Sequence, residues 1–164
     1  MMTTPTGAAI PRAPTLPRGV RNNNPGNLRH GDDWLGLSAI QTDTAFCQFD
    51  SPLYGLRALM RVLLNYRRKT DPQGRRIVTI RQAISRWAPP SENDTAAYVN
   101  TVARRLGVDP DAPLDWGYAE TLTGMARAIV THENGRAPQG SPADWYSPEH
   151  YHRAAMMALG LTEV

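Results

Sequence analysis

Apolar and polar positions alternate most regularly in the stretch 118–135, YAETLTGMARAIVTHENG. Its apolar residues recur at the three- and four-residue spacing of a helix with one buried face: Leu122, Met125, Ala126, Ile129 and Val130. Asn134 and Gly135 follow the last apolar turn, and glycine is the usual residue where a chain leaves a helix in the left-handed conformation. The pattern therefore predicts a helix that brings Glu133 to the place where the core meets solvent.

The position of Glu133 makes it a candidate proton donor. The C-terminal end of a helix carries partial negative charge, and the turn before Glu133 is apolar, so both surroundings disfavour the charged carboxylate. A carboxyl group whose protonated form is favoured can act as a general acid. An ordinary surface glutamate near a helix end is the alternative that these residues alone leave open.

The same periodicity predicts four more helices, and each has a recognisable start or stop. Proline after a serine favours a helix start, a threonine or serine can cap one, and glycine or paired prolines end one. The first of these helices should be the central buried one. The expected ranges are Ser51 to Lys69, Thr79 to Trp87, Ser91 or Asn93 to Gly107, and Ser147 to Gly160.

The N-terminal third lacks helical periodicity. Residues 1–18 are rich in Pro, Thr and Ala and predict a loosely held arm, so a single domain is expected over 19–164. Turn formers in 19–36 predict an ordered loop whose asparagines either satisfy backbone groups or face a polar ligand. Alternation in 37–49 predicts a hairpin with strands at 38–41 and 45–49. The expected fold is mainly α, of the α+β kind, with this one small hairpin.

Composition limits the class of protein without choosing a function. The 164 residues, 41% of them hydrophobic, suit one globular domain, and no signal peptide or membrane span is expected. The net charge of +3 suits a polyanionic partner such as nucleic acid or a bacterial cell wall. Cys47 is the only cysteine, which excludes an internal disulfide and favours a small buried side chain. His150 and His152 are two apart on a helix and point in different directions, so no metal or other cofactor is expected.

A general acid suggests glycoside cleavage, which usually needs a second carboxylate. Asp43, at the tip of the predicted hairpin, is the preferred candidate because a hairpin can hold a polar tip across a cleft from a helix end. The other candidates are Asp32, Asp33 and Asp50.

Several motifs carry a resemblance to a known group. They are RNNNPGNLR (21–29), WLG (34–36), FCQFDSPLYGLRAL (46–59), Thr79-Ile80, WAPPSENDTAAYV (87–99) and HENG (132–135). With them the chain resembles bacteriophage and prophage proteins that are often labelled virion structural proteins and assigned a lysozyme-like fold. It is also similar to lytic transglycosylases and goose-type lysozymes, with the pieces in a rotated order that resembles a circular permutation of the lysozyme core.

This resemblance implies a function. It implies a peptidoglycan-cleaving glycosidase, muramidase or lytic transglycosylase, that acts on the MurNAc–GlcNAc bond with Glu133 as the acid and Asp43 or the substrate's acetamido group as support. Asn134 departs from the serine that many relatives place there, and Asp43 stands where they have glutamate. The residues expected to contact glycan are Asn24, Asn27, Trp34, Thr42, Asn93, Thr95 and Tyr98. Tyr98 also fits a core position, Trp34 could instead cover the core, and Trp87 is expected to be a packing residue.

Two other functions stay open. A non-catalytic virion protein could keep the lysozyme shape. A nucleic-acid binder of the helix-turn-helix type could use 79–87 and 98–107 with Arg104 and Arg105, although Pro89-Pro90 and SENDT make the connection long. The expected partners are cell-wall peptidoglycan and phage virion proteins, with a monomer that reaches the periplasm by virion, holin or secretion system.

Overall fold

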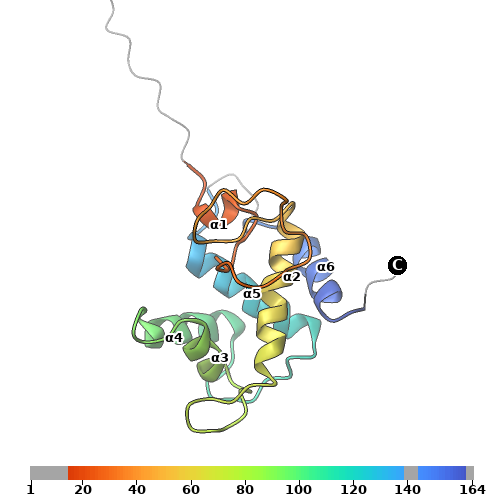
Figure 1. Ribbon diagram of the computed structural model, residues 1–164. Coiled ribbons are helices and arrows are strands. Elements are labelled where there is room, and N and C mark those ends of the chain that lie inside the picture. Colours follow the sequence, from red (N-terminus) through yellow and green to blue (C-terminus); the bar gives the residue numbers. More distant parts are fainter. Residues whose placement is uncertain (1–14, 139–143, 162–164) are drawn as a thin grey trace, which may run out of the picture.

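The computed structural model describes residues 15–138 and 144–161 and is mainly helical (Figure 1). The helices of this part are α1 (Arg18–Arg21), α2 (Pro52–Tyr66), α3 (Ile80–Trp87), α4 (Thr95–Leu106), α5 (Ala119–Asn134) and α6 (Pro148–Ala158). None of them is long and apolar enough to cross a membrane. Most of the predicted N-terminal arm, residues 1–14, lies outside the described range.

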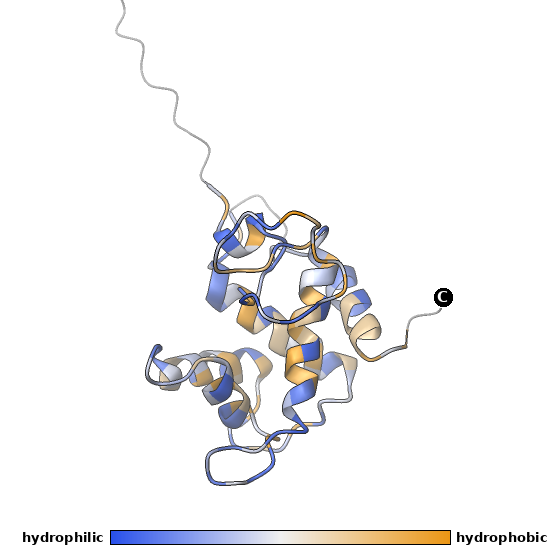
Figure 2. Ribbon diagram, in the orientation of Figure 1, coloured by the Kyte–Doolittle hydropathy of each residue, from blue (hydrophilic) through white to orange (hydrophobic). Residues whose placement is uncertain are grey.

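The core lies around α2, as the sequence predicts. α2 packs on α6 and α5, while α4 packs on α5 and α3. Leu56, Leu59 and Leu63 of α2 are fully buried, as are Leu122 and Ile129 of α5. Figure 2 shows the hydrophobic residues of α2 and α5 concentrated where the two helices meet in the middle of the molecule.

Local signals set the helix ends. Thr79 and Gln82 form a capping box at the start of α3, and Ser147 accepts a hydrogen bond from the His150 backbone N–H at the start of α6. α4 is capped by Asp94, whose carboxylate accepts from the Ala97 N–H at 3.1 Å, rather than by Ser91 or Asn93. Ser51 precedes Pro52 as predicted, but its side chain makes no capping hydrogen bond.

The predicted hairpin of 38–41 with 45–49 does not form as two regular strands, although the chain does turn back on itself here. Backbone pairing among the described residues is limited to isolated bridges, including Arg29 with Phe46 and Leu37 with Phe49. Segment 45–49 therefore lies between 28–30 and 36–38, and the Ser38 N–H donates to the Gln48 carbonyl at 2.9 Å.

Side chains replace the missing ladder at the tip of this loop. Gln41 Nε2 donates to the Gln48 carbonyl at 2.8 Å, and Gln41 Oε1 accepts from the Gln48 N–H at 2.8 Å. Gln48 Oε1 accepts from the Thr42 N–H at 2.6 Å. Because side-chain amides satisfy backbone groups here, the tip needs no regular strands.

Loop 22–50 packs tightly over α2 and has a small core of its own. Leu28, Cys47 and Phe49 are buried against Ala58 of α2, so Cys47 is the small buried side chain that the sequence predicts. A Cβ at Gly55 would come within 1.9 Å of the Asn23 carbonyl oxygen. Only glycine at this position lets the loop backbone lie directly on α2.

Candidate functional site

Glu133 lies in the last turn of α5, and its side chain is half-buried. The helix continues through Asn134 and ends at Gly135, which has a φ of +75°. Glu133 thus reaches the boundary between core and solvent that the apolar pattern predicts.

Three neutral side chains donate hydrogen bonds to the Glu133 carboxylate. Asn27 Nδ2 lies 3.2 Å from Oε2, while Trp87 Nε1 and the Tyr98 hydroxyl lie 3.4 Å and 3.3 Å from Oε1. Burial, reinforced by the negative charge of Glu133, raises the pKa of Tyr98 above its ordinary value, so its hydroxyl keeps its proton and remains a donor. The ring of His132 stacks on that of Tyr98, with centroids 3.5 Å apart.

Glu133 also forms part of the wall of an open cleft of about 520 Å³. Segment 26–29 and Phe46 line one side, and Tyr66, Trp87 and Ala88 line another, with Glu92 and Asn93 after the end of α3. The cleft therefore lies between the N-terminal loop and the α2, α3 and α5 helix ends, and its volume falls in the range of small-molecule sites.

Asn134 fixes the end of α5 against the N-terminal loop. Its Nδ2 donates to the Pro25 carbonyl at 2.8 Å and to the Val130 carbonyl at 2.9 Å. The Oδ1 atoms of Asn134 and Asn27 are both buried and lack a hydrogen-bond partner among the described residues. Both oxygens lie beside the Cα of Gly19, which leaves no room for a Cβ there. Asn134 thus sets the position from which Glu133 projects.

Some of the residues predicted to bind glycan are in the cleft and others are not. Asn27 and Asn93 line it, and Tyr98 lies behind Glu133 with only 1% of its surface exposed. The others serve the fold. Asn24 donates to the Leu28 and Cys47 carbonyls at 2.9 Å each, and Thr95 Oγ1 donates to the Ala88 carbonyl.

Trp34 and Thr42 also lie outside the Glu133 cleft. Trp34 lines a different hollow with Arg57 and Arg61, and it packs against the small core under the loop. Thr42 is engaged by Gln48 at the loop tip. Neither residue lines the Glu133 cleft.

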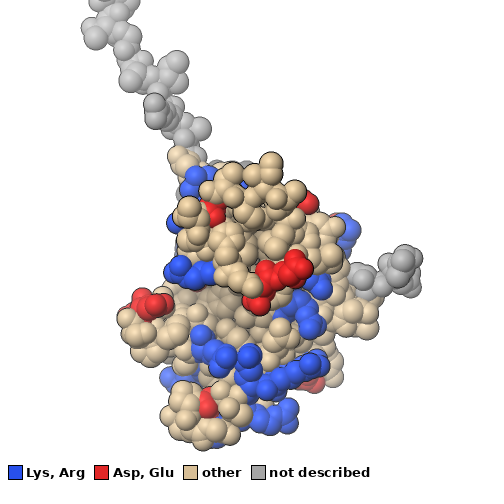
Figure 3. Space-filling view, in the orientation of Figure 1, with Lys and Arg blue, Asp and Glu red and all other residues tan. Residues whose placement is uncertain are grey.

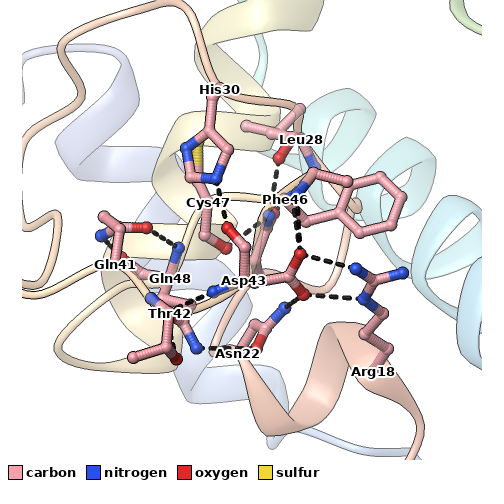
Figure 4. A network of polar contacts seen from close by, with 12 residues as sticks. Arg18, Asn22, Leu28, His30, Gln41, Thr42, Asp43, Phe46, Cys47 and Gln48 are labelled. Carbon is pink, nitrogen blue, oxygen red and sulfur yellow. Dashed lines mark hydrogen bonds and ion pairs between the residues drawn. The ribbon is translucent and has the colours of Figure 1, made fainter.

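Asp43 does not line the cleft. Its carboxylate is instead surrounded by hydrogen-bond donors that join α1 to the N-terminal loop (Figure 4). Its carboxylate accepts two hydrogen bonds from Arg18, at 2.6 and 2.7 Å, and others from Asn22 and the Ala45 and Phe46 N–H groups at 2.9 to 3.0 Å. The Arg18 guanidinium above all, and then the N–H groups, hold the pKa of Asp43 well below its usual range. Such a carboxylate joins α1 to the loop and has little freedom to act on a substrate.

Trp87 packs against the core, as its sequence context predicts, but it also has a place in the cleft, and the sequence gives no signal for Tyr66 or Glu92. The Trp87 indole N–H donates to Glu133, and all three residues line the cleft. They come from the end of α2 and the region around the end of α3. The proline pair after Trp87 is the sequence signal that could have pointed to this role of Trp87. A helix that stops at prolines places its last side chain beside a turn.

The helix-turn-helix alternative stays a prediction, although helices α3 and α4 do form over the two segments it needs. The N-terminal half of a recognition helix presents side chains to base edges. In this half of α4, Thr95 and Tyr98 are buried and Tyr98 donates to Glu133, while the exposed face carries Ala96, Ala97 and Asn100.

Comparison with known proteins gives a relative from a bacteriophage. No family model matches the chain. Protein P5 of the Pseudoalteromonas phage PM2 is 37% identical over 125 residues, which cover 74% of this chain and 73% of that protein. An identity of this level over most of both chains shows common descent, and the chain belongs to the family of protein P5 of phage PM2.

Proposed function

We propose that this protein is a glycosidase that cleaves the MurNAc–GlcNAc bond of peptidoglycan, with Glu133 as general acid. The observation that carries the proposal is a half-buried carboxyl group in the wall of an open cleft, at the end of a buried helix and among neutral donors only. Glycosidases need such a group at a cleft wall to protonate the leaving oxygen.

The contacts of Glu133 suit the two halves of a proton transfer. The carboxyl group gives its proton to the glycosidic oxygen, and the three donors then stabilise the carboxylate that remains. The same carboxylate accepts the proton of the water or sugar hydroxyl that completes the reaction. Asn27 and Asn93, which line the cleft, hold the glycan.

The positive centre that forms at the sugar needs a partner other than Asp43. Asp43 is already neutralised by Arg18, and moving it would break an ion pair and three further hydrogen bonds. We assign the supporting role to the acetamido oxygen of the substrate. Glu92 is the other carboxylate among the residues that line the cleft, and it is exposed.

The test is lysis of outer-membrane-permeabilised cells, followed by mass spectrometry of the muropeptides. Glu133→Gln should reduce lysis by at least about a thousandfold, because glutamine can neither donate the proton nor carry the negative charge of the carboxylate. Glu120→Gln is the matched control, because Glu120 is an exposed glutamate in the first turn of the same helix. Anhydro ends in the products identify a lytic transglycosylase and reducing ends a lysozyme. Undiminished lysis by Glu133→Gln contradicts the proposal.

A non-catalytic role in the virion is the second candidate, and the kinship with a phage protein favours it. The two candidate functions are compatible if the protein is a virion component that cleaves the wall, since the particle would then deliver the enzyme to the periplasm. Purified particles separate the possibilities. A protein that is found in the particles and is inert on cell walls is structural, whereas particles that lyse walls only with intact Glu133 carry the enzyme.

A further inference from the structure

Two arginines flank the Glu133 cleft, each beside an aromatic ring that lines it. The Arg29 guanidinium lies over the Phe46 ring, 5.2 Å from its centroid, and that of Arg86 lies over the Tyr66 ring at 5.6 Å. Phe46 and Tyr66 both line the cleft, from the N-terminal loop and from the end of α2 respectively. Arg29 itself lines the cleft on its loop side, whereas Arg86 does not line it and adjoins it through the Tyr66 ring on the helix side.

These two guanidinium groups contact aromatic rings without being neutralised by a carboxylate of the described residues. In the described part of the chain neither guanidinium forms a salt bridge, whereas those of Arg18, Arg75, Arg81 and Arg127 do. A backbone bridge pairs Arg29 with Phe46, so the two side chains start from neighbouring strand positions. A guanidinium that lies over a ring keeps the N–H groups at the edge of the guanidinium free. These groups can form a bidentate pair of hydrogen bonds with a carboxylate.

The charge continues beyond Arg86 on the helix side. Figure 3 shows basic side chains crowding the lower half of the visible face, with few acidic ones among them. Arg67, Arg68 and Lys69 are exposed after the end of α2. Asp71, the carboxylate in this stretch, is turned inward, with 5% of its side chain exposed and bonds to Gln82 and Arg75.

We propose that Arg29 and Arg86 make the cleft selective for glycan strands that carry carboxylates on both sides of the scissile bond. The inference rests on the proposed function only in that the cleft takes a glycan. A neutral polymer such as chitin would leave both cations unpaired. The carboxylates belong to an attached peptide or, where a sugar carries no peptide, to its free lactyl group, and the chemistry of recognition is the same for both.

Binding to purified sacculi tests this without any turnover. All variants carry Glu133→Gln so that the glycan is not cut, and cosedimentation gives the affinity. Arg29→Gln with Arg86→Gln should weaken binding about tenfold, as expected for two partly exposed charge pairs. Arg153→Gln is the matched control, since Arg153 is exposed on α6, does not line the cleft and lies over none of the described rings that line it. It should bind like the parent.

Neutralising the ligand should reproduce the effect of the substitutions. Sacculi whose carboxyl groups are coupled to ethanolamine should bind the parent about tenfold more weakly, and the double variant should lose nothing further. An amidase that removes the peptides also frees a lactyl carboxylate on each stripped sugar, so retained binding shows that a lactyl carboxylate is sufficient, and lost binding shows that the peptide carboxylates are required. Either result supports the proposal. Equal binding of the parent to blocked and native sacculi overturns it, as does unchanged binding by the double variant.

The two proposals fail separately. If wild type leaves sacculi uncut while binding depends on the arginines, the glycosidase proposal is wrong and the selectivity remains. If wild type lyses cells and the double variant binds sacculi as well as the parent does, the glycosidase proposal stands and the selectivity proposal is wrong.

Discussion

Replacing Gly19 with alanine should destabilise the protein, although alanine is the better helix former. Gly19 is buried in α1, and an added Cβ would lie 2.5 Å from Asn134 Oδ1. It would also lie 2.9 Å from both the Asn24 carbonyl oxygen and Asn27 Oδ1. None of these oxygens moves freely, because the Asn134 amide is held by the Pro25 and Val130 carbonyls and the Asn24 carbonyl belongs to the backbone. The methyl group must therefore displace α1, the loop or the end of α5.

The size of the effect follows from opposing contributions. Overpacking of a tight site costs about 1–3 kcal/mol, and a hydrogen bond lost from Asn134 costs about 1 kcal/mol more. Alanine regains up to about 1 kcal/mol of helix propensity, and less in a helix of only four residues. The net change in the free energy of unfolding should be a loss of about 2 kcal/mol.

Gly124→Ala is the matched control and should have the opposite sign. Gly124 lies inside α5, and an added Cβ would meet only Leu106 side-chain atoms at 3.4 to 3.9 Å, which is ordinary contact. It should stabilise the protein by roughly 0.5–1 kcal/mol.

Urea unfolding followed by circular dichroism measures both variants, with lysis assays on the folded proteins. Gly19→Ala should also slow lysis, because Asn134 and Asn27 adjoin Glu133. A Gly19→Ala protein as stable as wild type would refute the reasoning, since it would mean that the three oxygens can be moved without cost.

Three further substitutions test the site and the core. Asp43→Asn should make the stability of the protein less sensitive to acid. Arg18 lowers the pKa of Asp43 in the folded protein, so wild type gains stability from this carboxylate above about pH 4. This gain is lost as the pH falls through the lowered pKa of the folded state. Unfolding midpoints of the two proteins should therefore converge with falling pH. Trp87→Phe removes a donor to Glu133 and should slow lysis about tenfold with little change in thermal midpoint. Leu63→Ala should cost about 3 kcal/mol in urea unfolding, because Leu63 is fully buried in α2.

The sequence predicts the helices well because their signals are local. The starts of α2, α3 and α6 follow from Pro52, Thr79 and Ser147, and the end of α4 follows from Gly107 in the left-handed conformation. Each signal is complete within a few residues, so no tertiary information is needed.

The N-terminal loop could not be predicted in the same way. Its geometry depends on side-chain bonds across long sequence separations, such as Asn24 to Cys47 and Asn22 to Asp43. A Gln41 and Gln48 pair that replaces a strand ladder has no periodic signature. α1 is missed for a related reason, since its four residues hold no apolar stripe and are fixed by Asp43 and by contact with α5.

Asp43 and Glu133 show why residue type and position along the chain could not decide which carboxylates suit the proposed reaction. Both carboxylates accept several hydrogen bonds, but Asp43 faces a cation and backbone N–H groups at 2.6 to 3.0 Å. Glu133 faces only neutral side-chain donors at 3.2 to 3.4 Å. Moving or neutralising Asp43 breaks its ion pair with Arg18, whereas Glu133 forms no ion pair with the described residues, so of the two only Glu133 suits the proposed role as proton donor. The partners that make this difference lie up to 106 residues away along the chain, which is why the sequence indicates two acidic candidates and the fold separates them.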